Sequence, residues 1–421
     1  MDTLIIGCGA AGVAAAIAAA EQGEQVTVIE RNRKPLKKLG VTGNGRGNLL
    51  NCGQLRYYGD TAFAHQVLEK MPYAQVKAFL ESCGLTLTEE DEGRIYPAAY
   101  QASVAVDALL SRMEQLGIRI VCGAQATAIR HCGDQFVVDA VTTEYAPDFV
   151  KPNGKVKKGE ALRQWETAFS ARRVIVTAGG AAAPVHGTDG SIYSLLTALG
   201  HHLIPPRPAL CALVTAKTPL QGLSGQRVRA QLTLVAAHGA VLAKSRGEAL
   251  FADDGVSGIA AMQLARFVEP GCVLHMDLRE GLLGDAHGDA LAILTSRLER
   301  LGGTATPTQL LIGCANAALQ AALCRMAGID RSLPVDEKAL CALAAVLADY
   351  AIPVAGTRDF DQAQVTAGGL DAAQFDPSTM ESRLVPGLYA AGEVLDVDGD
   401  CGGYNLMFAF AGGLLAGKAG R

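Results

Sequence analysis

The stretch TLIIGCGAAGVAAAIAAAEQGEQVTVIE, residues 3–30, decides the fold. Thr3–Ile6 predicts a short buried strand, and the alanine-rich run after the turn predicts a helix. Gln25–Ile29 predicts a second strand, which leads into Glu30. A strand, the turn GCGAAG at Gly7–Gly12, a helix and a second strand followed by an acidic residue form the βαβ opening of a dinucleotide-binding fold.

Each glycine of this turn has a mechanical role. Gly7 permits the tight turn, Gly9 lets backbone N–H groups approach a pyrophosphate, and Gly12 lets the helix pack closely on the strand. The helix N-terminus offers partial positive charge to the phosphates. Glu30 can accept hydrogen bonds from both ribose hydroxyls, which favours an adenosine ribose without a 2′-phosphate. We expect a dinucleotide here, FAD rather than NAD, with a turn that serves packing alone as the alternative.

Composition and charge limit the class of protein. The 421 residues are 49% hydrophobic and 19% charged, which indicates a folded chain of two or three lobes. The 48 glycines are well above the usual share of about 7%, and without a G-X-Y period they should sit at particular turns. A net charge of −5 gives no sign of a nucleic-acid or anionic-membrane partner. The 11 scattered cysteines contain no CxxC pair, which favours a reducing compartment.

Residues 3–20 carry no charge and are long enough to suggest a membrane span. Asp2 precedes them without a basic residue, and three glycines and many alanines weaken their hydrophobicity. These features argue against both a transmembrane helix and a signal peptide. We therefore expect a cytoplasmic protein.

A second glycine-rich segment, residues 37–51, follows the βαβ unit. Four glycines and three asparagines within residues 40–51 exclude a regular helix or strand. Lys37, Lys38 and Arg46 add three cations, and the free backbone donors suit a diphosphate or an anionic flavin edge. A flexible surface loop is the alternative.

Two later strands end in similar turns. Residues 173–180, RVIVTAGG, form a buried strand with a small-residue turn, and residues 388–393, LYAAGE, repeat the design. Residues 405–417 then read as an apolar helix. Such turns gather at the carboxyl edge of a parallel sheet, where α/β folds bind ligands, although ordinary strand-to-helix turns are the alternative.

These motifs resemble the BaiN-like family of FAD-dependent oxidoreductases, also called the aminoacetone oxidase family. The matching stretches span nearly the whole chain. They are GCGAAG with Glu30, VTGNGRGNLLN (41–51), EGRIYPAAYQASVAVDAL (92–109), VIVTAGGAAAPVHGTDG (174–190), GEALFADDGVSGIAAMQLAR (247–266), VTAGGL (365–370) and TMESRLVPGLYAAGEVLDVDGDCGGYN (379–405).

Four positions depart from the family pattern. Gly47 stands where Cys is common, which argues against thiol chemistry in that loop. Ala252 and Asp253 stand where Thr-His is common, which removes a possible acid/base histidine, and Ile259 replaces a usual Pro. The substrate of a relative therefore does not transfer without a test.

The resemblance implies an α/β protein: a Rossmann-like, discontinuous FAD-binding domain with a single GxGxxG, an inserted β-rich lobe and a helical sub-domain. Residues 210–214 and 231–237 read as strands of the lobe, and residues 284–350 are rich in helix formers. Residues 142–169 predict an exposed hairpin. The expected boundaries are 1–193 and 361–421 for the FAD-binding domain, 194–250 and 335–360 for the β-rich substrate-side lobe, and 251–334 for the helical insertion.

We expect a tightly bound, non-covalent FAD and no metal. The acidic run at residues 396–400 lacks the spacing of a calcium loop. Cys8 and Cys401 could form a flavin link or act as redox thiols, but small buried filler is the stronger interpretation. The expected cofactor contacts are Gly7, Gly9, Ala10, Ala11, Gly12, Glu30, Arg31, Gly45, Arg46, Gly47, Asn48, Ala126, Thr177, Ala178, Gly179, Gly180, Gly392, Glu393, Gly402, Gly403, Tyr404 and Asn405.

The flavin would carry the hydride chemistry, and the protein would supply binding and orientation. Gly402 and Gly403 would open the last helix toward the flavin N1/O2 edge, with a plain N-cap as the alternative. The resemblance implies hydride transfer from flavin N5 to a conjugated C=C of a 3-oxo steroid, a bile-acid intermediate or another enone. NAD(P)H would visit transiently as donor, because the chain has no second GxGxxG.

The proton donor has three candidates, Tyr96, Tyr404 and His186, each of which has a structural alternative. Arg94 is a candidate for holding an anionic substrate group, with an ion-paired role as the alternative. We expect a small-molecule substrate and no nucleic acid. The oligomeric state stays open.

Two other functions remain. The first is a flavin oxidase of small amino ketones that passes electrons to O₂ and releases peroxide. The second is a flavin-bound tRNA- or partner-binding protein, which the negative net charge and the low aromatic content of 5% disfavour.

Overall fold

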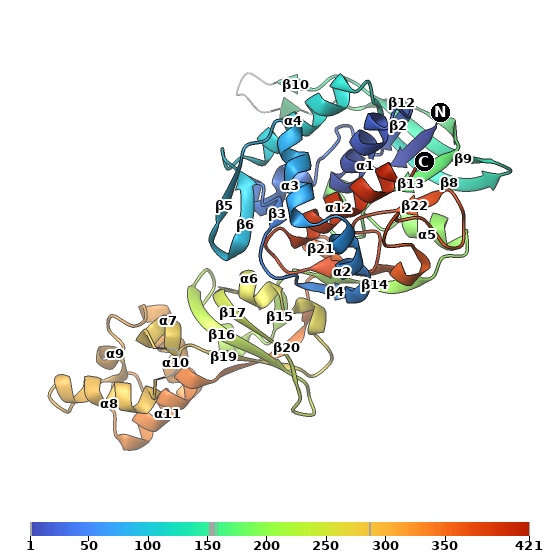
Figure 1. The fold of residues 1–421 in the computed structure, drawn as a ribbon. Helices are drawn as coiled ribbons and strands as arrows, with labels where there is room; N and C mark the ends of the chain where they lie inside the picture. Colours follow the sequence, from blue (N-terminus) through green and yellow to red (C-terminus); the bar gives the residue numbers. More distant parts are fainter. Residues whose placement is uncertain (1, 151–155, 158, 286–287, 421) are drawn as a thin grey trace. The chain divides into compact units, whose positions relative to one another are not determined.

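The computed structural model describes residues 2–150, 156–157, 159–285 and 288–420 (Figure 1). The chain divides into two compact units, Met1–Arg207 with Val365–Arg421, and Pro208–Gln364. The boundaries lie later than the predicted 193 and 361. The reason is strand β14 (Leu203–Ala209), which pairs with β21 (Val365–Leu370) and so keeps residues up to 207 with the first unit.

A five-stranded parallel sheet forms the centre of the first unit, in the order β22-β13-β1-β2-β7. Its strands are β1 (Thr3–Ile6), β2 (Val26–Glu30), β7 (Arg119–Cys122), β13 (Arg173–Val176) and β22 (Leu388–Ala390). All four pairings are parallel and in continuous register. Because β22 comes from the C-terminal part of the chain, the sheet confirms the predicted discontinuous Rossmann-like fold.

Two helices pack through their backbones beside this sheet, α1 (Ala10–Glu21) and α12 (Tyr404–Lys418). A Cβ on Gly413 would overlap the Ala11 carbonyl, and one on Gly417 would overlap the Ala15 carbonyl. Most residues of both helices are buried. The two ends of the chain are therefore part of one core.

The remaining elements of the first unit surround this core. A small antiparallel sheet contains β3, β5 and β6, and β4 pairs with β23. Their bounds are β3 (Leu50–Asn51), β4 (Tyr57–Gly59), β5 (Leu87–Glu90), β6 (Arg94–Pro97), β23 (Val397–Gly399), α2 (Thr61–Lys70), α3 (Tyr73–Ser82), α4 (Ala102–Gln115) and α5 (Ile192–Thr197).

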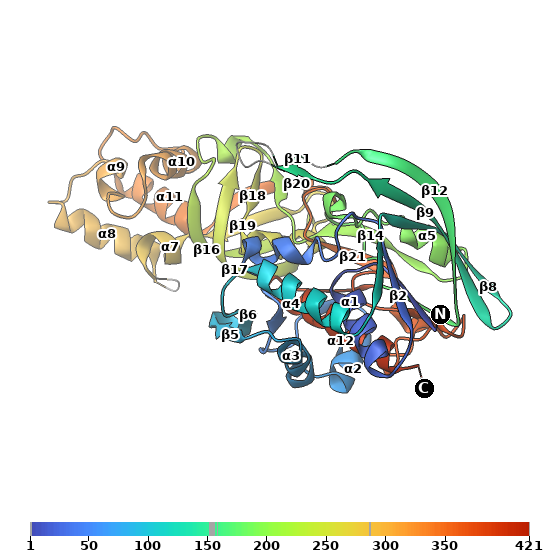
Figure 2. The ribbon, with the colours of Figure 1, turned by 90° about the horizontal axis from the view of Figure 1, so that it is seen from above.

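The predicted exposed hairpin is present and longer than expected. Strands β9 (Gln135–Tyr145) and β12 (Ala161–Ala171) run antiparallel, and β8 (Ala124–Cys132) joins them (Figure 2). Short strands β10 (Phe149–Val150) and β11 (Val156–Lys157) pair beyond them. Residues 151–155 and 158 of the predicted hairpin lie outside the described residues.

The second unit combines a closed barrel with helices. The barrel order is β15-β18-β17-β16-β19-β20. Its strands are β15 (Leu213–Thr215), β16 (Arg227–Val235), β17 (Val241–Ala252), β18 (Gly255–Ser257), β19 (Val273–Asp277) and β20 (Tyr350–Thr357), with α6 (Ile259–Met262) after β18. The predicted strand at 210–214 spans a break, because Leu210 has φ +49°.

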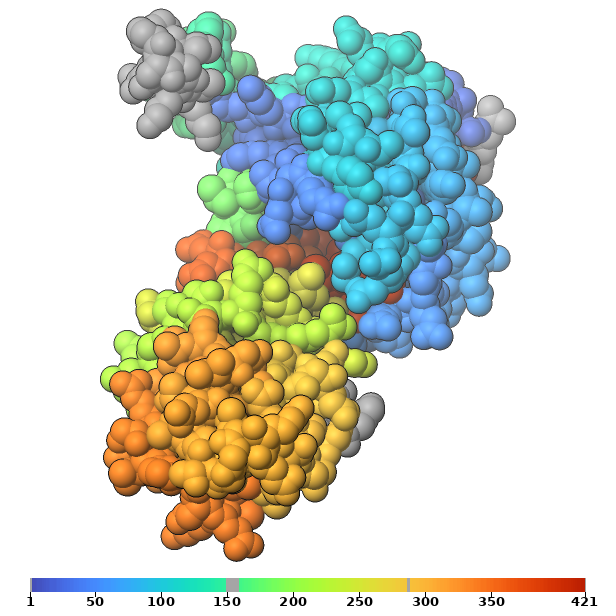
Figure 3. Space-filling view, turned by 90° about the vertical axis from the view of Figure 1, so that its left-hand side faces the viewer, coloured from blue at the N-terminus to red at the C-terminus, as the bar shows by residue number. Residues whose placement is uncertain are grey.

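The helical insertion begins later than the predicted 251 and extends beyond 334. Residues 251–277 still contribute to the barrel strands β17, β18 and β19. The helices are α7 (Arg279–Leu283), α8 (Ala290–Arg300), α9 (Pro307–Leu310), α10 (Ala317–Ala327) and α11 (Glu337–Ala348). Figure 3 shows this segment in yellow and orange as one continuous surface. Within the described residues, no helix has the length and apolar character of a membrane span.

His201 is a buried histidine in the first unit, 3% exposed and stacked on Phe375 with ring centroids 5.1 Å apart. Its Nδ1 lies 3.2 Å from the Leu196 carbonyl, which can only accept, so Nε2 accepts from Ser382 Oγ at 2.8 Å. Burial lowers the pKa of His201, while the Leu196 hydrogen bond opposes that effect. The folded state therefore favours the neutral form of the His201 ring.

We expect this histidine to make the free energy of unfolding depend on pH. Its folded-state pKa is depressed, so the unfolded chain binds the proton first, near pH 6.5, and stability falls as the pH drops through that value. His201→Gln should remove this part of the slope in urea unfolding between pH 7.5 and 5.5. His202→Gln, at an exposed neighbour, is the control. An unchanged slope in His201→Gln would contradict the prediction.

Candidate functional site

The turn Gly7–Gly12, which follows β1, packs closely against the end of β13. Gly7 has φ +102°, and a Cβ there would lie 2.7 Å from the Thr177 carbonyl oxygen. A Cβ on Gly12 would overlap the Gly7 carbonyl oxygen. Thr177 Oγ1 donates to that same oxygen at 2.8 Å. Gly7 and Gly12 therefore serve the close packing of the turn on β13, as the motif predicts.

Gly9 differs from its two neighbours in the motif. It is the N-cap of α1, and among the described residues no side chain caps the helix and, apart from the chain neighbours, no atom lies within 4 Å of the position of a Cβ. The N-terminus of α1 is thus left without a side-chain cap. This arrangement fits a pyrophosphate, which the helix N-terminus would bind.

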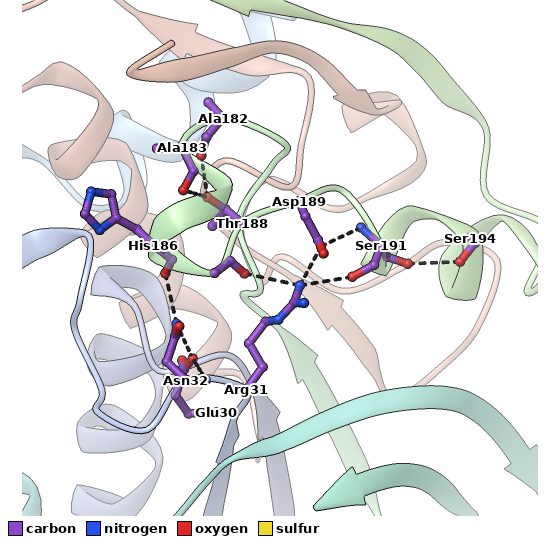
Figure 4. Close-up of polar contacts among 11 residues, drawn as sticks. Glu30, Arg31, Asn32, Ala182, Ala183, His186, Thr188, Asp189, Ser191 and Ser194 are labelled. Carbon is purple, nitrogen blue, oxygen red and sulfur yellow. Dashed lines mark hydrogen bonds and ion pairs between the residues drawn. The ribbon is translucent and has the colours of Figure 1, made fainter. Parts of the chain in front are cut away.

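Glu30 stands at the end of β2 and is 7% exposed. Its Oε2 accepts from the Cys8 backbone N–H at 2.8 Å. Its Oε1 accepts from the backbone and side chain of Asn32, both at 2.8 Å, and Figure 4 shows these two residues together. Asn32 in turn donates to the His186 carbonyl at 2.9 Å. The carboxylate is thus fixed beside the glycine turn, where the motif places a ribose.

Arg31 joins the same region to the turn after β13. Its Nη1 lies 2.5 Å from Asp189 Oδ1 and 3.3 Å from Ser191 Oγ (Figure 4). Burial alone would raise the pKa of Asp189, but hydrogen bonds from Arg31 and Ser191 outweigh it and lower the pKa to about 2. Arg31 therefore pairs with protein, and its contact with a cofactor stays a prediction.

The loop after α1 and β2 has a special backbone. A 3₁₀ segment covers Leu39–Gly45, and Gly43, Gly45 and Gly47 have φ of +58°, +83° and +77°. Arg46 is stacked on the rings of Tyr96 and Tyr100, at 4.6 and 4.7 Å, and its Nη2 lies 2.6 Å from Glu90 Oε1. The loop is thus an ordered structure, contrary to the flexible-loop alternative.

The start of α12 meets this loop. Gly403 is the N-cap with φ +98°, and a Cβ there would overlap the Leu50 carbonyl and lie 2.9 Å from Asn48 Oδ1. Asn51 Nδ2 donates to the Gly402 carbonyl at 2.8 Å. Asn48 Oδ1 is buried and has no hydrogen-bond partner among the described residues. A buried acceptor without a donor fits a bound group that brings an N–H or O–H.

The candidate proton donors fall into two places. A Cβ on Gly402 would lie 3.6 Å from Arg94 Nε and 3.7 Å from the Tyr404 ring, so Arg94 and Tyr404 flank it. Burial raises the pKa of Tyr96 and of Tyr404, and in both cases Arg94 is among the cations that oppose the rise. Both phenols are therefore neutral, and the Arg94 guanidinium itself pairs with Glu92, the ion-paired alternative for this arginine.

His186 lies in the turn after β13. Its backbone carbonyl accepts a hydrogen bond from Asn32, which also bonds Glu30 (Figure 4). Burial lowers the pKa of His186, and Lys37 and Lys38 lower it further. The structure thus separates this candidate from the two phenols. Its backbone carbonyl faces Asn32, whereas its ring points away from Glu30 and Asn32 (Figure 4).

The two sequence-marked cysteines show no sign of an activated thiol. Burial raises the pKa of Cys8 and that of Cys401, which disfavours the thiolate. Ala126 lies partly buried in β8, opposite Ala140 of β9, and its contact with a cofactor stays a prediction. No group of metal-ligating side chains occurs within the described ranges.

Comparison with known proteins identifies the family. Residues 1–419 match the family described as "HI0933-like protein Rossmann domain". The chain belongs to this family. A 3-dehydro-bile acid delta(4,6)-reductase of Clostridium scindens is 33% identical over 99% of this chain and 98% of its own length. A ribosomal RNA dihydrouridine synthase of Escherichia coli is 27% identical over 97% and 95%. The predicted BaiN-like family is confirmed, and the protein is an FAD-dependent oxidoreductase.

Solved structures show weaker likeness to this HI0933-like protein. A 3-ketosteroid-delta4-(5alpha)-dehydrogenase from Rhodococcus jostii has a TM-score of 0.45 and 17% identity, with 100% of this chain and 96% of that chain covered. A flavocytochrome c3 fumarate reductase has a TM-score of 0.46 and 15% identity, with 100% and 78% covered.

Several residues of this FAD site escaped the sequence analysis. Asn32, Asn51 and Thr366 each hold a segment of the candidate site by hydrogen bonds to residues far along the chain. Thr366 and Asn51 lie inside stretches that carry the family resemblance, which was the available signal. For Asn32 the sequence offers no signal beyond its position two residues after Glu30.

Gly9 and Gly12 of the turn should respond differently to a methyl group. Gly9→Ala places the methyl in open space, so the apoprotein should keep its thermal stability while FAD binds about tenfold or more weakly, roughly 1.4 kcal/mol. Gly12→Ala should lower the stability of the apoprotein as well, because the turn must move. FAD titration by fluorescence and thermal unfolding of the apoprotein measure both effects. Unchanged FAD affinity in Gly9→Ala would show that the pyrophosphate lies elsewhere.

Proposed function

We propose that this enzyme reduces a carbon–carbon double bond conjugated to a carbonyl, in a 3-oxo steroid, a bile-acid-like compound or another enone, with NAD(P)H as donor. The observation that carries the proposal is a pair of buried phenols, Tyr96 of β6 and Tyr404 at the start of α12, with Arg94 and Tyr404 on either side of Gly402. Reduction of an enone needs a hydride at the β-carbon and a proton at the α-carbon or the carbonyl oxygen. A neutral phenol near a guanidinium suits the second requirement.

The names of the relatives support this chemistry. A delta(4,6)-reductase of a 3-dehydro-bile acid acts on double bonds conjugated to a 3-oxo group, and a dihydrouridine synthase saturates the double bond of uracil beside a carbonyl. Both reactions add hydrogen across an activated C=C. The shared chemistry supports a conjugated C=C as the group reduced by this chain.

The residues divide the work as follows. FAD, when bound non-covalently, supplies hydride transfer through N5 from NAD(P)H to the substrate. The open side of Gly9 and the carboxylate of Glu30 would hold the pyrophosphate and the ribose, and Asn48 would accept a hydrogen bond near the start of α12. Tyr96 or Tyr404 would donate the proton, and Arg94 would orient the substrate oxygen.

An anaerobic stopped-flow experiment tests the proposal. The purified yellow protein is mixed with NADH or NADPH, and the reduced protein is then mixed with a panel of enones that includes a 3-oxo-Δ4 steroid. We expect one nicotinamide to bleach the flavin absorbance and an enone to restore it. If neither nicotinamide bleaches the flavin, the reductase proposal fails. Reoxidation by O₂ with peroxide, after reduction by aminoacetone-type amines, would favour the oxidase.

RNA is the second candidate substrate, because two ribosomal RNA dihydrouridine synthases match nearly the whole chain at 27% and 26% identity. The same reduced protein is therefore mixed with ribosomal RNA that lacks dihydrouridine. Reoxidation of the flavin together with a mass gain of two hydrogens in the RNA would favour this substrate. A lack of RNA binding at physiological salt would exclude it.

Replacing the phenols should separate the two half-reactions. Tyr96→Phe or Tyr404→Phe, whichever removes the donor, should slow reoxidation by the enone by about 10²-fold or more, the usual range for a general acid. Flavin reduction by the nicotinamide should stay unchanged, because it needs no phenol. Tyr100→Phe, which removes the hydroxyl of the exposed ring stacked on Arg46, is the control. Equal rates in all three variants would exclude a tyrosine donor.

A further inference from the structure

One carboxylate joins three segments of the FAD site that lie far apart in the sequence. Glu393, in the turn after β22, has its Oε2 at 2.7 Å from Lys38 Nζ. Its Oε1 accepts from the Thr366 backbone N–H at 3.0 Å and from Thr366 Oγ1 at 2.9 Å. Both carboxylate oxygens are therefore engaged by protein donors.

Thr366 passes this constraint to the turn after β13. It is fully buried, and its Oγ1 accepts from the backbone N–H groups of Ala181 and Ala182 at 2.8 and 3.0 Å. A Cβ on Gly180 would overlap Thr366 Oγ1 and lie 3.0 Å from Glu393 Oε1. The Thr366 hydroxyl donates one hydrogen bond and accepts two, so its O–H has a single orientation.

The Lys38–Glu393 pair is partly shielded from water, with side chains 26% and 18% exposed. Lys38 lies near the start of the segment 37–51, which also contains Asn48, the buried acceptor that has no partner among the described residues. The pair therefore fixes the N-terminal part of the segment that we assign to the flavin. Partial burial also weakens solvent screening, so each charge acts over a longer distance.

We propose that Glu393 is a positioning residue that holds Lys38 and the turn after β13 around the flavin, and that the balance between the two charges sets how readily the bound FAD is reduced. The proposal rests on the FAD dependence of the enzyme and on no particular substrate. Reduction adds negative charge to the flavin, which a cation favours and a carboxylate opposes. Glu393 then acts through Lys38 and Thr366, and its direct contact with the cofactor stays a prediction.

The test compares the flavin midpoint potentials of four proteins with that of the wild type. Lys38→Met should lower the potential, and Glu393→Gln should raise it, each by about a tenfold change in the reduction equilibrium, or about 30 mV for a two-electron couple. The double variant should return close to the wild-type value. Lys34→Met removes a charge from the same stretch at a side chain 79% exposed, and should leave the potential unchanged.

A purely structural role would give a different pattern. Shifts of the same sign in both single variants, no shift in either, or a Lys34→Met shift as large as that of Lys38→Met would each overturn the proposal. Because no substrate is present, these outcomes are independent of enone reduction.

A second pair of variants covers the case in which Glu393→Gln does not retain FAD. Thr366→Val removes the bridging hydroxyl and should weaken FAD binding about tenfold or more, while Thr366→Ser restores the hydroxyl and should restore the affinity. An equal loss in both would contradict the role of that hydroxyl.

Discussion

The backbone contact between α1 and α12 is the constraint on which the FAD site depends. Gly413 and Gly417 lack side chains at the positions where the carbonyl groups of Ala11 and Ala15 approach. Close contact fixes the N-terminus of one helix relative to the other. The N-terminus of α1 and the start of α12, which we assign to the cofactor, are thereby held in a fixed relation.

A buried arginine completes that contact. Arg173 is in β13, and its Nη1 and Nη2 donate to the carbonyls of Ala416 and Gly417, both at 3.0 Å, near the end of α12. Glu24 balances the charge, with its Oε2 3.0 Å from Nη2. Carbonyls at a helix C-terminus lack partners within the helix, and a cation there also complements the helix dipole. One side chain thus ties the helix to the central sheet.

The sequence predicts what is local and misses what joins distant segments. The turn at Gly7–Gly12, the strand at Thr3–Ile6 and the helix near 405–417 follow from glycine spacing and apolar runs, which act over a few residues. The pairing of Glu393 with Lys38 joins residues 355 positions apart, and no spacing rule connects them.

The charges assigned to the cofactor illustrate the same limit. Arg31 and Arg46 read as free cations in the sequence, yet Arg31 meets Asp189, and Arg46 lies between two tyrosines and Glu90. A charge near a glycine loop predicts anion binding only while its protein partners are unknown. Domain boundaries fail for a related reason, because the pairing of β14 with β21 is a long-range contact.

The departures from the family pattern differ in physical meaning. Gly47, where Cys is common, has φ +77°, and a Cβ there would lie 3.0 Å from the Cα of Ala102. A side chain at this position would need both a strained backbone and movement of α4, so the glycine suits this chain's own packing. Asp253 lies in the turn between β17 and β18, and Ile259 is 41% exposed at the start of α6. No packing in the core accounts for these two changes, which both fall in the second unit. One departure thus lies in the segment assigned to the flavin and has a packing explanation, whereas the departures of the second unit have none.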